Sequence, residues 1–407
     1  MADTHPALRQ HPAFVHYWWS RLTSGFAFQM LSVAVGWQIY AMTGRAFDLG
    51  MIGLVQFVPS LLLALPAGHV ADIFERRRII LTCQLTECAA VALLAAGSFL
   101  HWFGEVEILL IIFVFGVARA FEFPTMQALL PSLVPSTLLS RAMAAGSSAM
   151  QFAMIAGPAL GGFLYVAGPG TVYASCAALC VTAATFMWRI KVTRPPISRE
   201  PRTLKTVFAG ITFIRQRPVI LGAISLDLFA VLLGGVTALL PIFARDILHT
   251  GPWGLGLLRA APAVGAILMS LWLVRTPLTR KVGYIMFYSV AAFGVATVVF
   301  ALSKSFVLSM LALCALGAFD MVSMVIRGAL VQLDTPDAMR GRVSAVNAIF
   351  INTSNQLGEF ESGMTAAWFG TVPAALIGGI GTIIVVALWM RWFPDLRRRE
   401  RLESPDS

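Results

Sequence analysis

The stretch Ile108-Leu-Leu-Ile-Ile-Phe-Val-Phe-Gly-Val117 is continuously apolar, and Ile377-Gly-Gly-Ile-Gly-Thr-Ile-Ile-Val-Val-Ala-Leu-Trp-Met390 is nearly so. Apolar segments of about 20 residues are typical of helices that cross a bilayer. Backbone polar groups in lipid must be hydrogen bonded within the protein, so a spanning segment is a helix or part of a closed barrel. Because these runs do not alternate between polar and apolar residues, we predict helices.

The composition extends this prediction to the whole chain. Of its 407 residues, 58% are hydrophobic and 12% are charged, whereas a soluble domain has about 25% charged residues. We therefore predict an all-α membrane protein of twelve transmembrane helices in two six-helix repeats. The expected segments are 14–42, 49–73, 79–100, 106–131, 141–167, 171–189, 219–246, 253–274, 282–302, 306–332, 341–369 and 372–393.

One connection, Arg189–Arg217, is longer than the others and rich in basic residues and proline. It leaves six segments on each side, which indicates a linker between two bundles. Its basic residues are Arg189, Lys191, Arg194, Arg199, Arg202, Lys205, Arg215 and Arg217. The expected parts are an N-terminal bundle at 1–189, a cytoplasmic linker at 190–217, a C-terminal bundle at 218–393 and a cytoplasmic tail at 394–407.

An internal repeat supports two halves. Adding 201 to the residue numbers of the fourth and fifth segments aligns them with the tenth and eleventh without a gap. The matched pairs are Gly116/Gly317, Ala128/Ala329, Leu129/Leu330, Pro135/Pro336, Arg141/Arg342, Ala144/Ala345, Gly157/Gly358 and Gly162/Gly363. Repeated halves are how many transporters form a substrate site near the middle of the membrane.

The net charge of +10 is unevenly distributed along the chain. With both termini in the cytoplasm, 23 of the 30 basic residues fall on cytoplasmic loops and helix ends. The outer loops carry only Arg45, Arg245 and Lys304, and the other four basic residues lie within spans. Cytoplasmic loops of membrane proteins carry this excess of Lys and Arg. The basic balance therefore needs no nucleic-acid partner.

The loop after the second segment reads Gly68-His-Val-Ala-Asp-Ile-Phe-Glu-Arg-Arg-Arg78. It resembles the signature loop of the major facilitator superfamily, Gly-x-x-x-Asp-Arg/Lys-x-Gly-Arg/Lys-Arg/Lys. Gly68, Asp72 and the run Arg76, Arg77 and Arg78 are in register, while Ile73 and Glu75 depart from it. The resemblance implies a charged latch in which Asp72 caps a helix start or pairs with an arginine. The alternative is a plain basic loop.

A second motif, Gly157-Pro158-Ala-Leu-Gly161-Gly162, is similar to the exporter-associated signature of the superfamily, with Ala144 and Ala153 in place of its first two glycines. Small residues let helices approach closely and proline bends a helix, so a general tight interface is the alternative. The resemblance favours export over import.

Four further stretches, 37–44, 129–135, 340–347 and 355–360, resemble the enterobactin-exporter group of the superfamily. The resemblance spans most of the chain. It implies twelve helices, alternating access and proton-driven export of siderophores or drug-like molecules across a bacterial inner membrane. Members export unlike compounds, so the group does not name the substrate.

Charged residues within the segments are the candidates for proton coupling and for the cavity wall: Arg119, Glu122, Asp320, Arg327, Asp227 and Arg21. Charges in hydrocarbon are costly, so they normally face a partner or a cavity. We expect Glu122 or Asp320 to carry the proton, with Arg119 as modulator. Asp227, with Arg21 as its neighbour, suits a gate. The alternative is that these are static pairs that stabilise packing.

Two other segments also carry polar residues whose spacing allows more than one role. Asn352, Asn355, Gln356 and Glu359 recur every three or four residues and form one stripe. This stripe either lines the substrate path or bonds to a neighbouring helix. For Gln84 and Glu87 in the third segment we expect a packing role.

Other classes of chemistry have no support in the sequence. The six histidines are scattered, and we find no metal-ligand cluster, no phosphate-binding glycine-rich loop and no catalytic Ser/His/Asp set. We therefore expect no metal, no cofactor and no enzymatic activity. The expected partners are a small-molecule substrate, protons and the lipid bilayer, with the chain acting as a monomer. A lipid or lysolipid flippase on the same fold and a membrane receptor without turnover are the rival interpretations.

The charge distribution generates a topology prediction. Reporter fusions placed after Arg194 and after Arg399 should both give a cytoplasmic signal, because the basic linker and tail lie on the cytoplasmic side. Paired cytoplasmic and periplasmic reporters at each site make the measurement. A periplasmic signal at either site would overturn the twelve-span arrangement.

Overall fold

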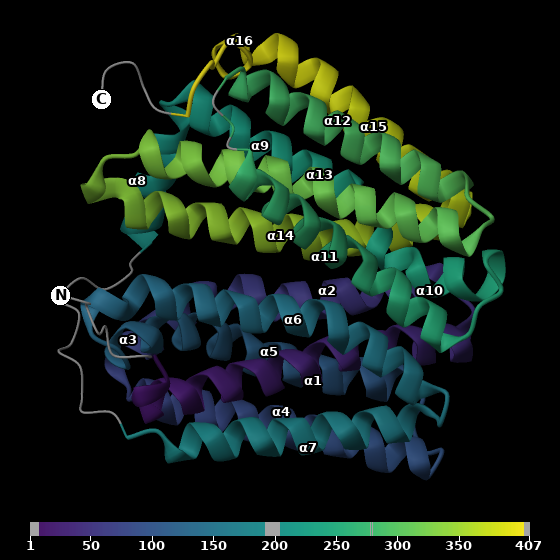
Figure 1. The fold of residues 1–407 in the computed structure, drawn as a ribbon. Helices are drawn as coiled ribbons and strands as arrows, with labels where there is room; N and C mark the ends of the chain where they lie inside the picture. Colours follow the sequence, from purple (N-terminus) through teal and green to yellow (C-terminus); the bar gives the residue numbers. More distant parts are fainter. Residues whose placement is uncertain (1–7, 192–203, 277, 279, 403–407) are drawn as a thin grey trace. The chain divides into compact units, whose positions relative to one another are not determined.

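The computed structural model describes the chain except for residues 1–7, 192–203, 277, 279 and 403–407 (Figure 1). Within the described residues the chain forms helices and no strand. This confirms the all-α prediction, and it follows from the continuous apolar runs, whose backbone groups are hydrogen bonded along each helix.

The first six spans are formed by long helices joined by short turns. They are α1 (Pro12–Thr43), α2 (Ala46–Leu62) with α3 (Ala64–Ile73), α4 (Arg76–Phe99), α5 (Glu105–Leu129), α6 (Leu139–Tyr165) and α7 (Pro169–Arg189). Short 3₁₀ turns precede α1 and separate α5 from α6; these are η1 (Leu8–Gln10), η2 (Leu130–Ser132) and η3 (Ser136–Leu138).

The second six spans begin after the helix α8 (Leu204–Arg215). The first of them is composite: α9 (Pro218–Leu233) continues through η4 (Val236–Leu239), α10 (Leu240–Ile242) and the π-helical turn η5 (Phe243–Ile247). The others are α11 (Pro252–Arg275), α12 (Val282–Leu302), α13 (Phe306–Leu333), α14 (Asp337–Phe369) and α15 (Thr371–Trp392), followed by the short α16 (Pro394–Arg397).

The number of spans agrees with the prediction. Among the described residues, seven continuous helical segments are long and apolar enough to cross a membrane, and the bent pair α2–α3 makes an eighth. Four more helices, α1, α5, α6 and α14, have 25 to 33 residues. At about 1.5 Å per residue, each can cross a hydrocarbon core of about 30 Å. The total is the expected twelve, with ends a few residues from those predicted.

The contacts divide the chain into two units, one of Met1–Gln38 with Val58–Arg202 and one of Ile39–Phe57 with Thr203–Ser407. In the first, α4 packs against both α5 and α7. In the second, α13 packs against α11 and α12, and α15 packs against α12 and α9. Each unit has its own buried apolar core, and the proposed boundary at 190–217 stays a prediction.

The expected linker is only in part a connecting segment. Its residues 192–203, with Arg194, Arg199 and Arg202, lie outside the described residues. The remainder includes α8, whose Ile214 is buried against Val343 and Val346 of α14. This helix was not predicted, because basic and proline residues precede it and only one of its faces is apolar.

The tail after α15 is also held in place as far as residue 402. Leu396 is fully buried, and Arg399 pairs with Asp334 at the end of α13 with 2.7 Å between Nη2 and Oδ1. The backbone carbonyl of Arg399 accepts a hydrogen bond from the amide of Gly283 at 3.0 Å. This part of the expected tail is therefore part of the second unit.

Two glycines set the distance between α11 and α13. A Cβ atom added to Gly317 of α13 would collide with the carbonyl group of Pro262 in α11, and one added to Gly265 of α11 would collide with the carbonyl group of Cys314. These backbones can touch because neither position has a side chain.

We expect Gly317→Ala to destabilise the protein by roughly 1–3 kcal/mol, because the new methyl group must push two helix backbones apart. Gly328→Ala is the matched control on the same helix, since a Cβ there meets nothing within 4 Å. Thermal unfolding of the purified protein in detergent measures both. Equal melting temperatures for Gly317→Ala and Gly328→Ala would contradict the close contact.

Candidate functional site

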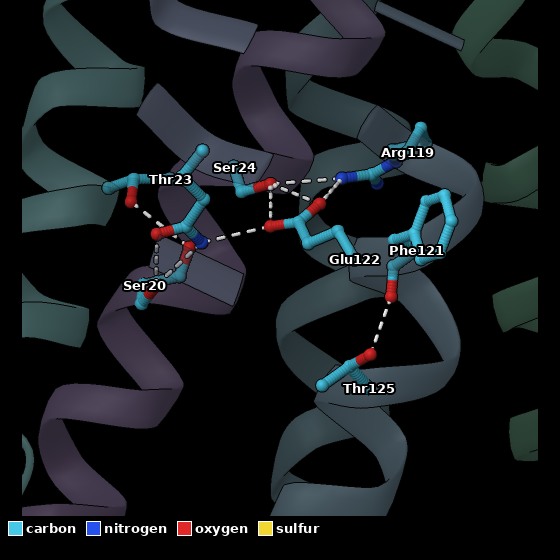
Figure 2. Close-up of polar contacts among 8 residues, drawn as sticks. Ser20, Thr23, Ser24, Arg119, Phe121, Glu122 and Thr125 are labelled. Carbon is cyan, nitrogen blue, oxygen red and sulfur yellow. Dashed lines mark hydrogen bonds and ion pairs between the residues drawn. The ribbon is translucent and has the colours of Figure 1, made fainter. Parts of the chain in front are cut away.

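A polar cluster lies between α1, α4 and α5 in the first unit (Figure 2). Its centre is the carboxylate of Glu122, which pairs with Arg119 one turn earlier on α5. Ser24 of α1 donates to Glu122 Oε1 at 3.1 Å and accepts from Arg119 Nη1 at 2.9 Å. Gln84 of α4 donates to Glu122 Oε1 at 2.9 Å. The carboxylate thus has donors from three helices.

The sequence builds this cluster by repeating polar residues at helical spacing. Ser20 and Ser24 are four residues apart on α1, Gln84 and Glu87 three apart on α4, and Arg119 and Glu122 three apart on α5. Residues three or four apart lie on one face of a helix. Three otherwise apolar helices therefore each present one polar face.

Burial makes these contacts strong. Glu122 is 1% exposed and Gln84 is fully buried, while the Arg119 side chain keeps 18% exposure. The guanidinium of Arg119 also lies over the ring of Phe28, 4.8 Å from its centroid, a favourable cation–π contact. Arg119 is therefore held on one side by a carboxylate and on another by an aromatic face.

Glu87 belongs to this cluster, although the sequence analysis assigned it to packing. Its side chain is 1% exposed, and its carboxyl group contacts that of Glu122. The signal was present in the sequence, because Gln84 and Glu87 place two polar side chains on one face of an apolar helix.

Arg21 lies close to the cluster on α1 but has a different partner. Its Nη1 donates to the hydroxyl oxygen of Tyr17 at 3.0 Å, and the Tyr17 hydroxyl donates to the carbonyl oxygen of Met126 at 3.2 Å. Arg21 thus has its partner in the first unit, and Asp227 has its partner in the second. The gate that pairs Arg21 with Asp227 stays a prediction.

In the second unit, Asp227 of α9 pairs with Arg327 of α13. Both side chains are buried, with 7% and 4% exposure. By spacing alone, Arg327 lies two turns after Asp320 on one face of α13. That association was incomplete, because the nearest carboxylate to Arg327 comes from a neighbouring helix and spacing within one helix does not reveal it.

Asp320 itself has no hydrogen bond or ion pair with another described residue. It lines a small cavity within the second unit together with Asp227, Ser323 and the ring of Phe293. The Ser323 side chain is 1% exposed, and its hydroxyl has no partner among the described residues. Two acidic residues and a serine with an unpaired hydroxyl therefore line one small cavity.

The polar stripe on α14 is only partly tied to other helices. Asn355 donates to the carbonyl oxygen of Ile351 on its own helix at 2.9 Å. Glu359 lies near enough to Arg259 of α11 for electrostatic attraction. Gln356 also has an interaction within the protein. The role of Asn352 and its neighbours in a substrate path stays a prediction.

Within the part of the chain that the structure describes, Asp72 of the signature loop makes neither of its two expected contacts, a helix cap or a pair with an arginine. Asp72 lies in the last turn of α3 and caps no helix, since α4 has Glu75 at its N-cap. Among the described residues Asp72 pairs with no arginine. Arg76 instead donates to the carbonyl oxygen of Ala128 at 2.8 Å, and Arg78 pairs with Glu75 at 2.7 Å.

Arg77 and the loop glycine complete the motif. Arg77 donates to the carbonyl oxygen of Trp188 at the end of α7, and Gly68 lies within α3. The arginines therefore fasten the loop to the ends of α5 and α7. A latch at Asp72 remains a proposal about another conformation of the protein.

The exporter-type motif forms a close contact between α6 and α1. A Cβ atom on Gly157 would lie 2.7 Å from Cβ of Gln29, and one on Gly161 would lie 2.9 Å from Cα of Met30. Pro158 and Gly162 are buried in the same stretch of α6. Among the residues that the structure describes, no group of three or more His, Cys, Asp or Glu side chains could hold a metal ion.

Comparison with known proteins places this geometry in a family. The model of the transmembrane secretion effector family matches residues 4–405. The chain is 26% identical over 406 residues to the enterobactin exporter EntS of Citrobacter koseri, covering 98% of this chain and 96% of the relative. It is 25% identical to EntS of Escherichia coli, covering 96% and 94%.

Solved structures share the fold. The bacterial homolog of the human lysosomal transporter Spinster, in an inward-facing and unoccupied conformation, aligns with a TM-score of 0.74 and 14% identity over 98% of this chain and 100% of that one. The nucleoside transporter NupG aligns with a TM-score of 0.68 and 14% identity over 94% and 99%. These likenesses confirm the predicted fold class.

The buried pair of Asp227 and Arg327 generates a prediction that separates structure from transport. Arg327→Met or Asp227→Leu alone should cost about 3–5 kcal/mol of stability, because each leaves one buried charge without a partner. The double variant should regain most of this loss, since no charge remains. Thermal unfolding gives the stabilities.

Transport by the double variant then decides the role of the pair. A stable double variant that transports as well as the unaltered protein would show a static packing contact. A double variant that is no more stable than either single variant would contradict the pairing itself.

Proposed function

Because the chain belongs to the transmembrane secretion effector family of the major facilitator superfamily, we propose that it is a secondary active exporter of a small organic molecule, siderophore-like or drug-like. The protein is a multi-pass membrane transporter. In the proposal, it moves its substrate outward by alternating access while protons move inward. The names of the EntS relatives support a siderophore-like substrate.

The observation that carries proton coupling is the burial of acidic groups inside spanning helices of both units. Glu122 is held by donors from three helices, and Asp320 lines a small cavity beside Asp227. Acidic residues inside membrane spans are costly and commonly form proton relays in transporters. Energy from ATP would need a phosphate-binding loop, for which the sequence gives no support.

We assign the proton to Glu122 or Asp320, with Arg119 as modulator. A carboxylate beside a guanidinium is stabilised in its charged form, and a buried carboxylate without one is not. Movement of Arg119 relative to Glu122, or of water into the cavity at Asp320, would therefore change the proton affinity during the cycle. Arg327 and Asp227 fit a supporting gate.

The other predicted residues fit subordinate roles in this proposal. Asn352, Asn355, Gln356 and Glu359 would line the substrate path, and Gly68, Asp72 and Arg76–Arg78 would form the switching loop. The close contact at Gly157 and Gly161 would keep α6 against α1. We also propose a bacterial inner membrane with both termini cytoplasmic, and a monomer as the working unit.

Proteoliposome transport of enterobactin and of ethidium, a drug-like probe, tests the function. Export driven by a proton gradient would support the exporter. Movement of lipid with no response to either soluble probe would indicate a flippase, and ligand binding without movement would indicate a receptor.

Two substitutions test the proton carrier. Asp320→Asn and Glu122→Gln are made separately and measured for gradient-driven accumulation and for substrate exchange without a gradient. The variant at the carrier should keep exchange and lose accumulation, because exchange returns the substrate without moving a proton. Glu361→Gln is the control, a carboxyl in α14 that accepts a hydrogen bond from Thr365 on its own helix at 2.7 Å.

Full gradient-driven accumulation in both variants would move the coupling site elsewhere, and Glu359 would be the next residue to test. Accumulation lost in the Glu361 control would show that any neutralised carboxyl disturbs the fold.

A further inference from the structure

Glu87 and Glu122 bring two carboxyl groups together, and only one protonation state of the two explains their contact. The Glu87 side chain is 1% exposed and its Oε1 has no hydrogen-bond partner among the described residues. Glu87 lies one turn after Gln84, which donates to Glu122 Oε1 at 2.9 Å, so α4 brings the Glu87 carboxyl group to that of Glu122. A carboxylate accepts hydrogen bonds but cannot donate one, while a protonated carboxyl can donate. The contact is therefore a hydrogen bond only when one of the two groups holds a proton.

The charges around the contact lead to the same state. Arg119 pairs directly with Glu122 and acts electrostatically on Glu87. With both carboxyls ionised, the buried cluster has a net negative charge, and with both protonated it has a net positive charge. Buried net charge is costly. One proton on the two carboxyls makes the cluster neutral.

The neighbouring cysteine and tyrosine side chains do not alter this balance. Cys83 of α4, Cys180 of α7 and Tyr17 of α1 act electrostatically on the two carboxyls or are acted on by them. These side chains are neutral near pH 7. Arg21, the other cation near the cluster, donates to the Tyr17 hydroxyl and, among the described residues, makes no hydrogen bond or ion pair with either carboxyl group.

We propose that Glu87 and Glu122 bind one proton between them, and that this shared proton is the one exchanged during transport, with Arg119 as the fixed countercharge. The proposal rests on the proposed proton-coupled export and narrows its carrier to this pair. It assigns Glu87, which neither the fold nor the family signatures single out, to the coupling site.

The proposed step is a reversible acid dissociation. While the cluster is closed to water, the carboxyl–carboxylate pair and Arg119 are neutral together. When water enters from the cytoplasmic side, the O–H bond of the protonated carboxyl breaks, the proton passes to water, and both carboxylates are solvated. Protonation from the opposite side restores the pair. Ser24 and Gln84 continue to donate to Glu122 and keep it in position.

Infrared spectroscopy of the purified protein in lipid tests the shared proton without any substrate. The unaltered protein should show the C=O stretch of a buried protonated carboxylic acid at neutral pH. Glu87→Gln and Glu122→Gln should each remove the same band, because the remaining carboxyl is then balanced by Arg119 and ionises. The double variant should remove nothing more, and Glu361→Gln should keep the band.

Transport of enterobactin and ethidium by the same variants tests the coupling. Glu87→Gln should retain exchange and lose gradient-driven accumulation, while Glu87→Asp, which keeps a carboxyl, should restore accumulation at least in part. If Glu87→Gln does not fold, the infrared spectrum of Glu122→Gln and the transport of Glu87→Asp still test the pair.

The outcomes separate the shared proton from the proposed function. A band that persists in Glu87→Gln but disappears in Glu122→Gln would assign the proton to Glu122 alone and overturn the pair. Proton-driven accumulation that survives Glu87→Gln would overturn its role in coupling. If the band behaves as expected but the unaltered protein moves neither probe with protons, the proposed function fails while the shared proton stands.

Discussion

The cost of placing charge in hydrocarbon governs the interior of this protein. Most buried charges whose contacts we describe obtain a partner from their own helix or from a neighbouring one, whereas Asp320, which has none among the described residues, lines a small cavity. Glu122 is bound by Arg119, Ser24 and Gln84, and Asp227 is bound by Arg327. Because these partners come from different helices, the charges also hold α1, α4 and α5 together in one unit and α9 with α13 in the other. Polar contacts among apolar helices thus serve packing and chemistry at the same positions.

Most of the fold could be predicted from the sequence, because the length and polarity of each span are set by the bilayer rather than by tertiary contacts. The helix α12 begins and ends at the expected residues, and α14 begins four residues before its expected start at 341. The break between α2 and α3 was missed because apolar residues continue through Leu63. The helix α8 was missed because its twelve residues follow a basic, proline-rich stretch.

The candidate site could be predicted only one helix at a time. Spacing places Arg119 beside Glu122, and the structure brings the two together. It does not place Asp227 beside Arg327 or Glu87 beside Glu122, since such contacts depend on how each helix is rotated about its own axis. That rotation is fixed by packing of side chains from all neighbouring helices. The residues that sequence reasoning undervalued are therefore those whose partners lie on another helix.

The glycine contact between α11 and α13 has a mechanical consequence. Gly265 lies against Cys314 and Gly317 against Pro262, so the two backbones touch over one turn of each helix. Helices fastened in this way neither slide nor separate without large strain, since packed interiors transmit displacement instead of absorbing it. During a conformational cycle, α11 and α13 should move together as one lever, and flexing must occur in other helices.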